Sequence, residues 1–444
     1  MVIQPAHGFF VSSRQHRIDG AVTPMDPLAY LGDLSSRPIR LGLAPLRRLL
    51  VRMKHPEKKY ASMIIGGTNG KGSIAAMAAA MLTAGGFRVG LYTSPHLLDI
   101  RERIRIDGRM IAMKDLRAFA GEIKRRLQED LSYFEFLTAM AFHYFDQQRV
   151  NVAVLEVGMG GRLDATNVAD PAVSVISNIS LDHRQYLGMK IEQIAREKSG
   201  IIGSGGCCLT AARQKQVVGI LEEACQKKQS RFFRVGDEIK TRRQAGGGFS
   251  FRGLGKRYDH LCCPLRGRHQ IDNAALAVGA VVLLAGHGFV VEEEAIRRGL
   301  RETQWEGRLE TLRERPTVLV DGAHNPAGIS SLCAALKDEF CYRRLTVVFG
   351  VLEDKDHRTM LKRLAPLADR LILTRPESER SLSPAVILQA ARQYYRCAEV
   401  IEQPEQALRE ALTTADPDDL ICVTGSLYLV GAVKRFFKER CGVS

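Results

Sequence analysis

Residues 65–73 have the sequence Ile-Gly-Gly-Thr-Asn-Gly-Lys-Gly-Ser and lie between a short apolar run and an alanine-rich segment over residues 73–84. Glycines allow a tight turn after a strand, so that backbone N–H groups and a helix N-terminus face a phosphate while the lysine meets its oxygens. The stretch departs from the strict phosphate-loop pattern, because Ile65 holds the first glycine position and Gly72 separates Lys71 from the serine. A glycine-rich turn without a ligand is the alternative, but a strand before the turn and a helix after it favour phosphate binding. The residues expected to contact phosphate are Thr68, Asn69, Gly70, Lys71, Gly72 and Ser73.

Short apolar runs alternate with helical patterns around and after this turn. A long helix is predicted at residues 273–285, after a glycine-rich, charged hairpin near residues 242–258. An amphipathic helix is predicted at residues 134–148, and strands are predicted at residues 63–65, 89–92, 152–157 and 173–179. Such alternation is typical of a mostly parallel sheet covered by helices, with ligands at the carboxyl ends of the strands. The sequence therefore predicts an α/β fold with a P-loop-type first domain.

A second and smaller set of strand–helix units follows a break in the pattern at residues 300–313. Its predicted strands are residues 317–320, 345–349, 371–374, 400–401 and 420–423. This set predicts a smaller, Rossmann-like α/β domain at the C-terminus. We place the boundary near residues 304–308, so that the expected domains are residues 1–304 and residues 305–444.

The 444-residue chain is basic overall, with 64 Lys plus Arg against 49 Asp plus Glu and a formal charge of +15. A basic balance favours anionic partners, but the basic residues are spread along the chain, which argues against a dedicated nucleic-acid arm. No apolar stretch approaches the length of about 18 residues that a membrane span needs. Residues 1–20 lack the basic and apolar regions of a secretory signal. We therefore expect a cytoplasmic protein with neither a nucleic-acid nor a membrane partner.

Glu156 ends the apolar strand predicted over residues 152–157 and is followed by glycines. In an α/β fold this position lies where ligands bind, and a carboxylate there is a natural ligand for Mg²⁺ together with substrate phosphates. Buried acids at strand ends are also often purely structural, so both interpretations stand for Glu156 taken alone.

Three other polar residues are ambiguous from the sequence alone. His183 follows the strand predicted at residues 173–179, where a lone histidine is more often a satisfied core residue than a ligand. Lys198 follows a helical turn and is most simply a surface lysine. Asp321 ends the first strand of the second domain and is well placed to face a nucleotide bound to the first. The Asn325-Pro326 pair that follows predicts a capped helix start.

Taken together, these segments resemble the folylpolyglutamate/dihydrofolate synthases, a branch of the Mur-type ligases. The matching motifs occur in family order across nearly the whole chain. Those of the first domain are Tyr30-Leu31 with Leu41-Gly42-Leu43, the loop at residues 65–73, Thr93 to Leu97, Tyr133 to Glu135 with Thr138, Glu156 to Asn167, Leu181 to His183, Glu197 to Ile201, and His269-Gln270 with Asn273-Ala274. Those of the second are Gly307-Arg308, Asp321 to Pro326, Gly350 to Leu352 with Asp354 to Asp356, and Thr424 to Tyr428.

The resemblance implies specific roles for these positions. It implies that Lys71 and the loop amides hold the ATP phosphates, and that Asn273, Arg308 and Asp321 contact ATP. A first Mg²⁺ would be held by Ser94, Glu156 and His183, and a second by a CO₂-derived carbamate on Lys198. The implied pterin-substrate pocket comprises Tyr133, Phe134, Glu135, Leu163, Asp164 and Ala165. His324 is expected near the centre of acyl transfer, so that the implied catalytic residues are Lys71, Lys198, Asp321 and His324.

The implied reaction is phosphoryl transfer from ATP to the carboxylate of dihydropteroate or a reduced folate, followed by attack of the L-glutamate amine on the acyl phosphate. By family analogy the protein is expected to be a monomer. Asp99-Ile100 departs from the usual family sequence close to the expected pterin loop and bears on substrate preference. A Mur-type ligase for a non-folate acid and a nucleotide-switched or nucleic-acid-dependent NTPase are the rival interpretations. The motifs do not separate a dihydrofolate synthase, a folylpolyglutamate synthase and a bifunctional enzyme.

Overall fold

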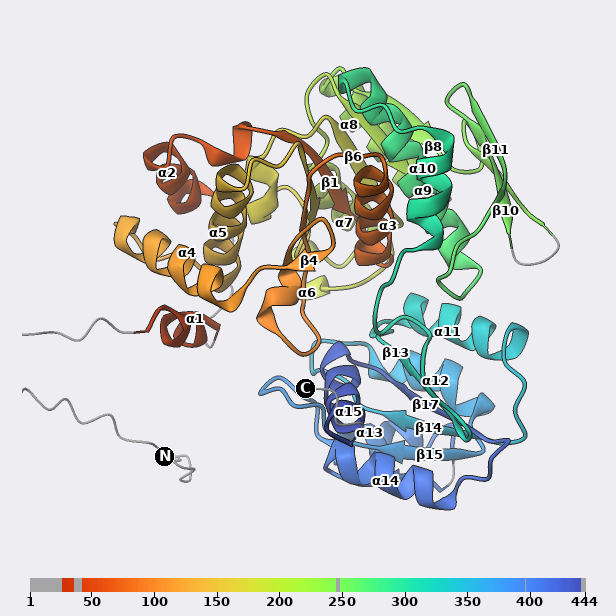
Figure 1. Ribbon diagram of the computed structural model, residues 1–444. Helices are drawn as coiled ribbons and strands as arrows, with labels where there is room; N and C mark the ends of the chain where they lie inside the picture. Colours follow the sequence, from red (N-terminus) through yellow and green to blue (C-terminus); the bar gives the residue numbers. More distant parts are fainter. Residues whose placement is uncertain (1–25, 36–41, 245–247, 396, 441–444) are drawn as a thin grey trace, which may run out of the picture.

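A computed structural model describes residues 26–35, 42–244, 248–395 and 397–440 of the chain. Residues 1–20, where the sequence predicted no secretory signal, lie outside the described residues, and so does Leu41 of the family motif. Two sheets with helices on their faces dominate the structure, one in the N-terminal part of the chain and one in the C-terminal part (Figure 1).

The first sheet is eight-stranded and has the order β4-β3-β2-β5-β1-β6-β7-β8. Its strands are β1 Ala61–Gly66, β2 Val89–Tyr92, β3 Ile104–Ile106, β4 Arg109–Met110, β5 Val152–Glu156, β6 Val173–Ile176, β7 Cys207–Thr210 and β8 Arg231–Arg234. Within the order β2-β5-β1-β6-β7-β8, every neighbouring pair is parallel. At the edge of the sheet, β3 pairs antiparallel with β2, and β4 pairs antiparallel with β3. The prediction of a mostly parallel sheet is therefore confirmed.

Helices cover both faces of this sheet. One face packs against α1 Pro27–Ser35, α2 Ala44–Arg52, α4 Met113–Arg126, α5 Tyr133–Gln147, α7 Ile191–Ser199 and α8 Lys215–Lys227. The other face packs against α3 Lys71–Ala84, α9 His269–Leu284 and α10 Glu293–Arg301. The short helix α6 Arg184–Leu187 lies in the loop after β6.

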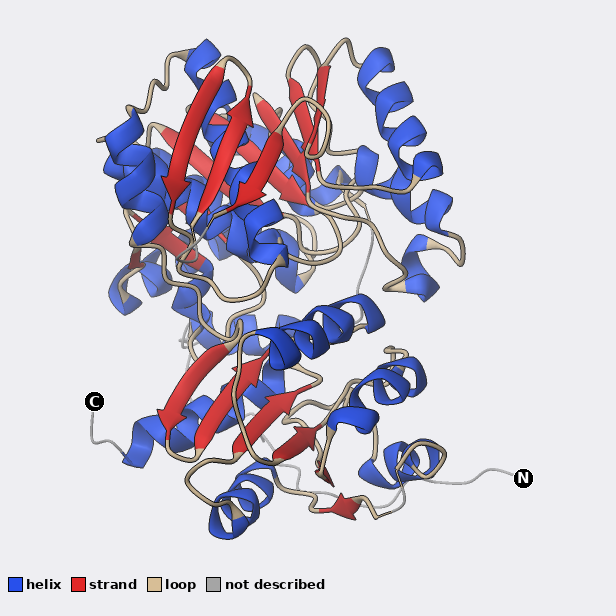
Figure 2. Ribbon diagram, turned by 90° about the vertical axis from the view of Figure 1, so that its right-hand side faces the viewer, coloured by secondary structure: helices blue, strands red, loops and turns tan. Residues whose placement is uncertain are grey.

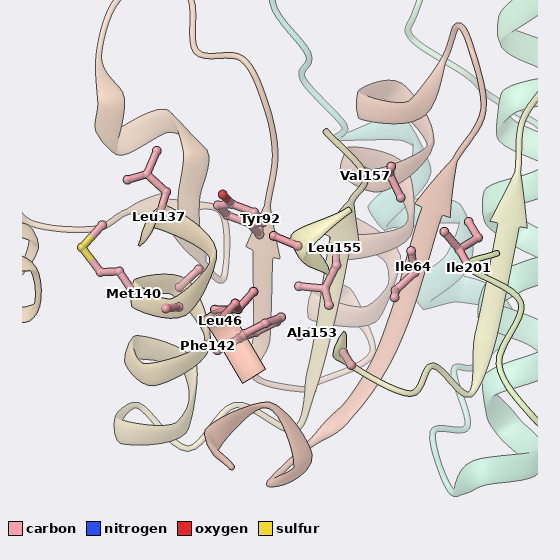
Figure 3. Packing of buried hydrophobic residues seen from close by; sticks show 14 of the residues in the cluster. Leu46, Ile64, Tyr92, Leu137, Met140, Phe142, Ala153, Leu155, Val157 and Ile201 are labelled. Atoms are coloured by element: carbon pink, nitrogen blue, oxygen red, sulfur yellow. The ribbon is translucent and has the colours of Figure 1, made fainter. Parts of the chain in front are cut away.

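Successive residues of the central strands point to opposite faces. Ile64 and Leu155 pack into the cluster beneath α5, where they lie near Tyr92 and Val157 (Figure 3). Met63 belongs to the cluster on the α3 face instead. Because both faces are covered by helices, the strands are apolar at nearly every position, which explains why they stand out as continuous apolar runs in the sequence.

The second sheet is six-stranded and has the order β12-β13-β17-β14-β15-β16. Its strands are β12 Glu310–Glu314, β13 Thr317–Asp321, β14 Leu345–Phe349, β15 Arg370–Leu373, β16 Glu399–Val400 and β17 Leu420–Thr424. Its helices are α11 Pro326–Asp338, α12 His357–Leu364, α13 Pro384–Ala391, α14 Pro404–Thr414 and α15 Leu427–Arg440. Two buried clusters lie on opposite faces of this sheet, and helices flank it on both sides (Figure 2). The predicted boundary at residues 304–308 falls between α10 and β12 and stays a prediction.

Some predicted elements differ in extent from the observed ones. The strand predicted at residues 173–179 ends at Ile176, and the helix predicted from Asn273 begins at His269, because Gly267 in a left-handed conformation turns the chain into it. The predicted hairpin is a three-stranded antiparallel sheet of β9 Lys240–Arg243, β10 Phe249–Gly253 and β11 Lys256–Leu261.

One helical stretch among the described residues, His269–His287, is long and apolar enough to cross a membrane by length and composition alone. Within it, 67% of the apolar window is buried inside the structure, and α9 packs against α3 in the core. This is weak evidence for a membrane span, because the core helix of a globular domain has the same composition.

Candidate active site

The loop between β1 and α3 is fixed by the neighbouring end of β6. The N–H of Thr68 donates to the carbonyl of Asn178 at 2.8 Å, and the N–H of Asn69 donates to the Asn178 side chain at 3.2 Å. The hydroxyl of Ser177 donates to the carbonyl of Asn69 at 2.6 Å. These bonds hold the loop at the carboxyl end of the sheet, where the first turn of α3 follows.

Two glycines of this loop cannot carry a side chain. Gly70 has a φ of +86°, and a Cβ there would lie 2.5 Å from Oδ1 of Asn273. A Cβ on Gly72 would lie 2.7 Å from the indole ring of Trp305. Glycine at these positions lets α9 and the residues after α10 pack directly against the loop. The contact brings Asn273, a predicted ATP-binding residue, to the start of α3.

Lys198 is buried, so its interpretation as a surface lysine is wrong. It lies in the last turn of α7, and its Nζ donates to the carbonyl of Gly67 at 2.6 Å. Burial and the neighbouring Lys71 ammonium lower the pKa of Lys198 to about 7. A substantial fraction of the amine is therefore neutral and nucleophilic at neutral pH.

Glu156 is buried at the end of β5, and one of its oxygens accepts a hydrogen bond of 3.0 Å from the N–H of Ser94. Burial raises the pKa of Glu156, although the charges of Lys71 and Arg308 and the Ser94 N–H act in the opposite direction. A carboxylate that is desolvated in this way gains most from a nearby cation. The predicted pair of Ser94 and Glu156 is thus brought together.

Asp182 joins the two halves of the chain. Its carboxylate accepts hydrogen bonds from Nζ of Lys355 at 2.8 Å and from Nδ2 of Asn325 at 3.0 Å, and Nε2 of His324 lies 3.6 Å away. Burial disfavours the ionised carboxyl group, yet His324 and Lys355 hold the pKa of Asp182 below its usual range. The side chain is therefore an anion at neutral pH.

His183 lies at the start of α6 with its side chain 32% exposed, so its interpretation as a satisfied core residue is wrong. Its Nδ1 lies 3.7 Å from the Asp354 carboxylate, and its Nε2 lies 3.3 Å from Nζ of Lys355. Burial lowers the pKa of His183 to about 4, with Lys355 acting in the same direction. The imidazole is neutral at neutral pH, which is the form that binds metal ions.

The glycine-rich loop also contacts the second sheet directly. The side-chain amides of Asn69 and Asn325 bond to each other reciprocally at 3.1 and 2.9 Å. Asn325 caps α11 by accepting from the N–H of Gly328, and Pro326 occupies the first turn, as the sequence predicted. The start of α11 is therefore hydrogen-bonded to the glycine-rich loop after β1.

The other predicted residues of the second sheet lie in the same region. Asp321 ends β13 and accepts from the N–H groups of Leu309 and Ala323 at 3.0 and 2.9 Å. A guanidinium N–H of Arg308 donates to the carbonyl of Gly307, and its charge acts on Glu156 across the interface. Nδ1 of His324 lies 2.8 Å from the carbonyl of Gly322.

A small cavity lies between these groups. It is lined by residues of both halves of the chain: Gly67, Thr68, Lys71, Val157, Gly158, Met159, Gly160, Asp182, His183, Lys198 and His324. Three of the predicted catalytic residues, Lys71, Lys198 and His324, thus face one space, and Asp321 lies outside its lining.

The residues predicted for a pterin pocket lie near this cavity but not in its lining. The ring of Phe134 fills the space beside Gly158, where a Cβ would lie 2.7 Å from it, and the guanidinium of Arg103 lies 5.4 Å from the centroid of the Tyr133 ring. Glu135 is buried and bonds to Ser132 in a capping box.

Asp164, the other acid of this group, is buried and caps a short helical turn that begins with Ala165. Burial raises its pKa, against the hydrogen bonds from the N–H groups of Met159 and Thr166. Leu163 is half-buried beside it. Asp164 thus has structural bonds that account for its burial, whereas Oε1 of Glu135 is buried without a hydrogen-bond partner among the described residues.

The described residues contain no group of three or more His, Cys, Asp or Glu side chains arranged to hold a metal ion. The predicted set of Ser94, Glu156 and His183 supplies only two such side chains. That number fits Mg²⁺, which is usually bound through one or two carboxylates with water and substrate phosphates completing its shell.

Three residues of the site received no catalytic or ligand-binding role from the sequence, namely Asp182, Lys355 and Asn325, although Asn325 was predicted to cap a helix. Asp182 and Lys355 stand in recognisable motifs, Leu181 to His183 and Asp354 to Asp356. Their contact depends on the two sheets meeting, and a pattern along the chain does not show which loops will face each other.

Comparisons with known proteins agree with this geometry. Residues 65–281 match the family described as the Mur ligase middle domain, and residues 307–427 match the Mur ligase, glutamate ligase domain. The dihydrofolate synthase/folylpolyglutamate synthase of Bacillus subtilis is 33% identical over 418 residues, which cover 90% of this chain and 96% of the relative.

Solved structures are similar over almost the whole chain. E. coli FolC in complex with DHPP and ADP has a TM-score of 0.87 and 30% identity, covering 94% of this chain and 99% of the other. A bifunctional folylpolyglutamate synthase/dihydrofolate synthase with Mn, AMPPNP and L-glutamate bound has a TM-score of 0.84 and 30% identity, covering 93% and 98%. The chain therefore belongs to the dihydrofolate synthase/folylpolyglutamate synthase family of Mur ligases and is an ATP-dependent ligase.

Proposed function

We propose that this ligase adds L-glutamate to dihydropteroate, to tetrahydrofolate (poly)glutamates, or to both, through an acyl phosphate. The observation that carries the proposal is the convergence of Lys71, Lys198, Asp182 and His324 on one cavity between the two sheets. A γ-phosphate held at Lys71 and an acceptor carboxylate opposite it would react there, held close together by groups from both halves of the chain.

ATP would bind at the start of α3. Backbone N–H groups of residues 68–73 and the Lys71 ammonium would hold its phosphates, while Asn273, Arg308 and Asp321 would contact the rest of the nucleotide. The close packing of Asn273 against Gly70 supports this assignment. Because Asp321 ends a strand of the second sheet and Arg308 lies just before that sheet, a bound nucleotide would contact both halves of the chain.

A divalent cation would be held by Ser94, Glu156 and His183, and a second by a modified Lys198. These residues fit Mg²⁺, since Glu156 is a desolvated carboxylate and His183 a neutral imidazole. When bound, such ions neutralise the charge that develops on the transferring phosphoryl group.

Lys198 would carry the carbamate. Its neutral amine attacks the carbon of CO₂, a C–N bond forms, and the nitrogen loses a proton to solvent, so that a potential cation becomes an anion. A buried amine with a pKa near 7 supports this assignment. The alternative is that Lys198 keeps its ammonium and only holds the Gly67 carbonyl.

The acceptor would lie along the segments of Tyr133 to Glu135 and Leu163 to Ala165, with its carboxylate directed to the cavity. His324 and other residues of the second sheet would face the incoming glutamate amine. We further propose that residues 1–304 and 305–444 act as two domains of a cytoplasmic monomer.

The test is incorporation of labelled L-glutamate with Mg-ATP and either dihydropteroate or tetrahydrofolate as the acceptor. Product from dihydropteroate alone identifies a dihydrofolate synthase, product from tetrahydrofolate alone a folylpolyglutamate synthase, and product from both a bifunctional enzyme. If neither acceptor gives product in protein that still binds ATP, the ligase acts on another acid and the proposal is contradicted.

A further inference from the structure

The antiparallel sheet of β9, β10 and β11 has one apolar and one basic face. Phe249, Phe251 and Tyr258 are buried in the cluster shared with α9 and α10. Because successive residues of a strand alternate between faces, their neighbours project outward. The pairing register brings four cations to that outer side, here called the basic face: Lys240, Arg242, Arg252 and Arg257.

The basic face places like charges directly opposite one another. Arg252 pairs with Lys240 on one side and with Arg257 on the other, so that three cations form a row across the three strands. Like charges at directly opposed positions destabilise a sheet. This row therefore costs stability that the apolar face has to offset.

Little within the protein neutralises these cations. Arg257 donates to the carboxylate of Asp259 at 2.8 Å, and Lys240 donates to the carbonyl of Gly236 at 2.8 Å. Within the described part of the chain, the guanidinium groups of Arg242 and Arg252 make no hydrogen bond or ion pair. Two of the four cations thus lack an internal partner, and the other two have only exposed partners that a phosphate can replace.

The basic face is separate from the candidate active site. Figure 1 shows β10 and β11 at the outer edge of the first domain, beyond α9. None of the four basic residues lines the cavity that contains Lys71 and Lys198. An anion bound here would leave the nucleotide site open.

We propose that the basic face docks on the sugar–phosphate backbone of a nucleic-acid duplex, without preference for base sequence. Guanidinium groups pair well with phosphate oxygens, and a duplex offers the densest regular row of phosphates. The sequence favoured no nucleic-acid partner because its basic residues are spread out, but folding brings residues 240–242 beside residues 252–257.

The composition of the sheet favours a duplex over other polyanions. None of the exposed large apolar side chains among the described residues lies between residues 240 and 261. Single-stranded nucleic acids are usually bound by stacking on exposed aromatic rings, and membrane surfaces by apolar side chains inserted beneath basic ones. The basic face has neither.

The test is fluorescence anisotropy with labelled DNA and RNA duplexes of about 20 base pairs, titrated at several KCl concentrations around about 100 mM. Saturating Mg-ADP is present throughout, to keep phosphates out of the nucleotide site. Full-length wild type is compared with Arg242→Gln/Arg252→Gln. The control is Arg213→Gln/Lys227→Gln, which removes the same charge from side chains that are 77% and 72% exposed and paired elsewhere.

Four phosphate contacts predict a slope of about −3.6 for log K against log salt on duplex DNA. The basic-face variant should bind about tenfold more weakly, with a slope nearer −1.8, while the control changes less than about twofold. Ligase turnover should be unchanged and the unfolding midpoint unchanged or higher, because like-charge pairs are removed.

Three results would overturn the proposal. They are an equal loss of binding in both double variants, absence of salt-dependent binding by wild type, and a preference of the same residues for anionic vesicles over duplexes. The first would show that duplex binding depends on the net charge of the protein and not on the basic face. The last would assign the basic face to membranes.

Discussion

Nζ of Lys355 lies 2.8 Å from Oδ1 of Asp182, and this ion pair connects the loop after β6 in the first sheet with the loop after β14 in the second. Both side chains are only 6% exposed. The pair lies beside His183 and the cavity, so one of the contacts between the two halves of the chain also borders the proposed site of chemistry.

Lys355→Met should therefore weaken both folding and catalysis. Removing one partner of a buried ion pair leaves the other charge uncompensated and typically costs about 3–5 kcal/mol. We expect a loss of that size in the free energy of unfolding by urea, and a loss of turnover. Lys337→Met, at an exposed position of α11, should change stability by less than about 0.5 kcal/mol.

The double variant Asp182→Asn/Lys355→Met tests whether the pair itself is responsible. Removing both charges avoids the buried unpaired carboxylate, so part of the lost stability should return. Additive losses in the double variant would show that the two residues act independently.

Gly70→Ala should weaken nucleotide binding through the clash with Asn273. The backbone at Gly70 has a φ of +86°, whereas Gly86 has a φ of +87° and a Cβ on it would meet no atom within 4 Å. Gly86→Ala therefore reproduces the backbone strain, about 1 kcal/mol, without the clash. Calorimetry with ADP should show affinity lowered by about tenfold or more for Gly70→Ala only, since one clash of this kind costs at least about 1.4 kcal/mol. Equal affinities would separate Gly70 from the nucleotide.

Turnover should depend on CO₂ and rise with pH through about 7. The pKa of Lys198 is lowered to about 7, so protonation below that pH removes the neutral amine that CO₂ requires, and the carbamate fraction grows as pH rises. Enzyme depleted of CO₂ should lose activity and regain it with bicarbonate. Lys198→Ala should bind ADP but lose most activity, and wild-type turnover in this variant would remove the carbamate from the mechanism.

Glu156→Gln should lose metal binding while keeping the fold. The substitution preserves the volume and the acceptor for the Ser94 N–H but removes the anionic oxygen that a divalent cation needs. Electron paramagnetic resonance of Mn²⁺ in the presence of ADP should show affinity lowered by about tenfold or more. Glu353→Gln, at an exposed position, serves as the control, and unchanged Mn²⁺ affinity in Glu156→Gln would place the metal elsewhere.

The sequence predicted most of the secondary structure because the strands are buried on both faces. Val89–Tyr92 and Leu345–Phe349 were predicted with their observed bounds, since helices on either side demand apolar residues at each position. The turn at residues 65–73 was recognisable because glycine is required by its local geometry. These signals are short-range and lie along the chain.

The contacts between the two halves were harder to predict, because they depend on three-dimensional packing. Lys198 looked like a surface residue until the folded chain buried it against Gly67. Asn325 was predicted as a helix cap, which it is, but its amide also bonds to Asn69 and Asp182. Lys355 stands in a charged Asp-Lys-Asp sequence that resembles an exposed loop.

The most direct test of acyl-phosphate formation at this site follows oxygen-18 from the acceptor carboxylate. Dihydropteroate or tetrahydrofolate labelled in the reacting carboxyl group is incubated with enzyme, Mg-ATP and L-glutamate, and the products are examined by mass spectrometry. Attack of the carboxylate on the γ-phosphate predicts one labelled oxygen in inorganic phosphate for each amide formed. Label in AMP, or amide formation with unlabelled phosphate, would contradict the mechanism.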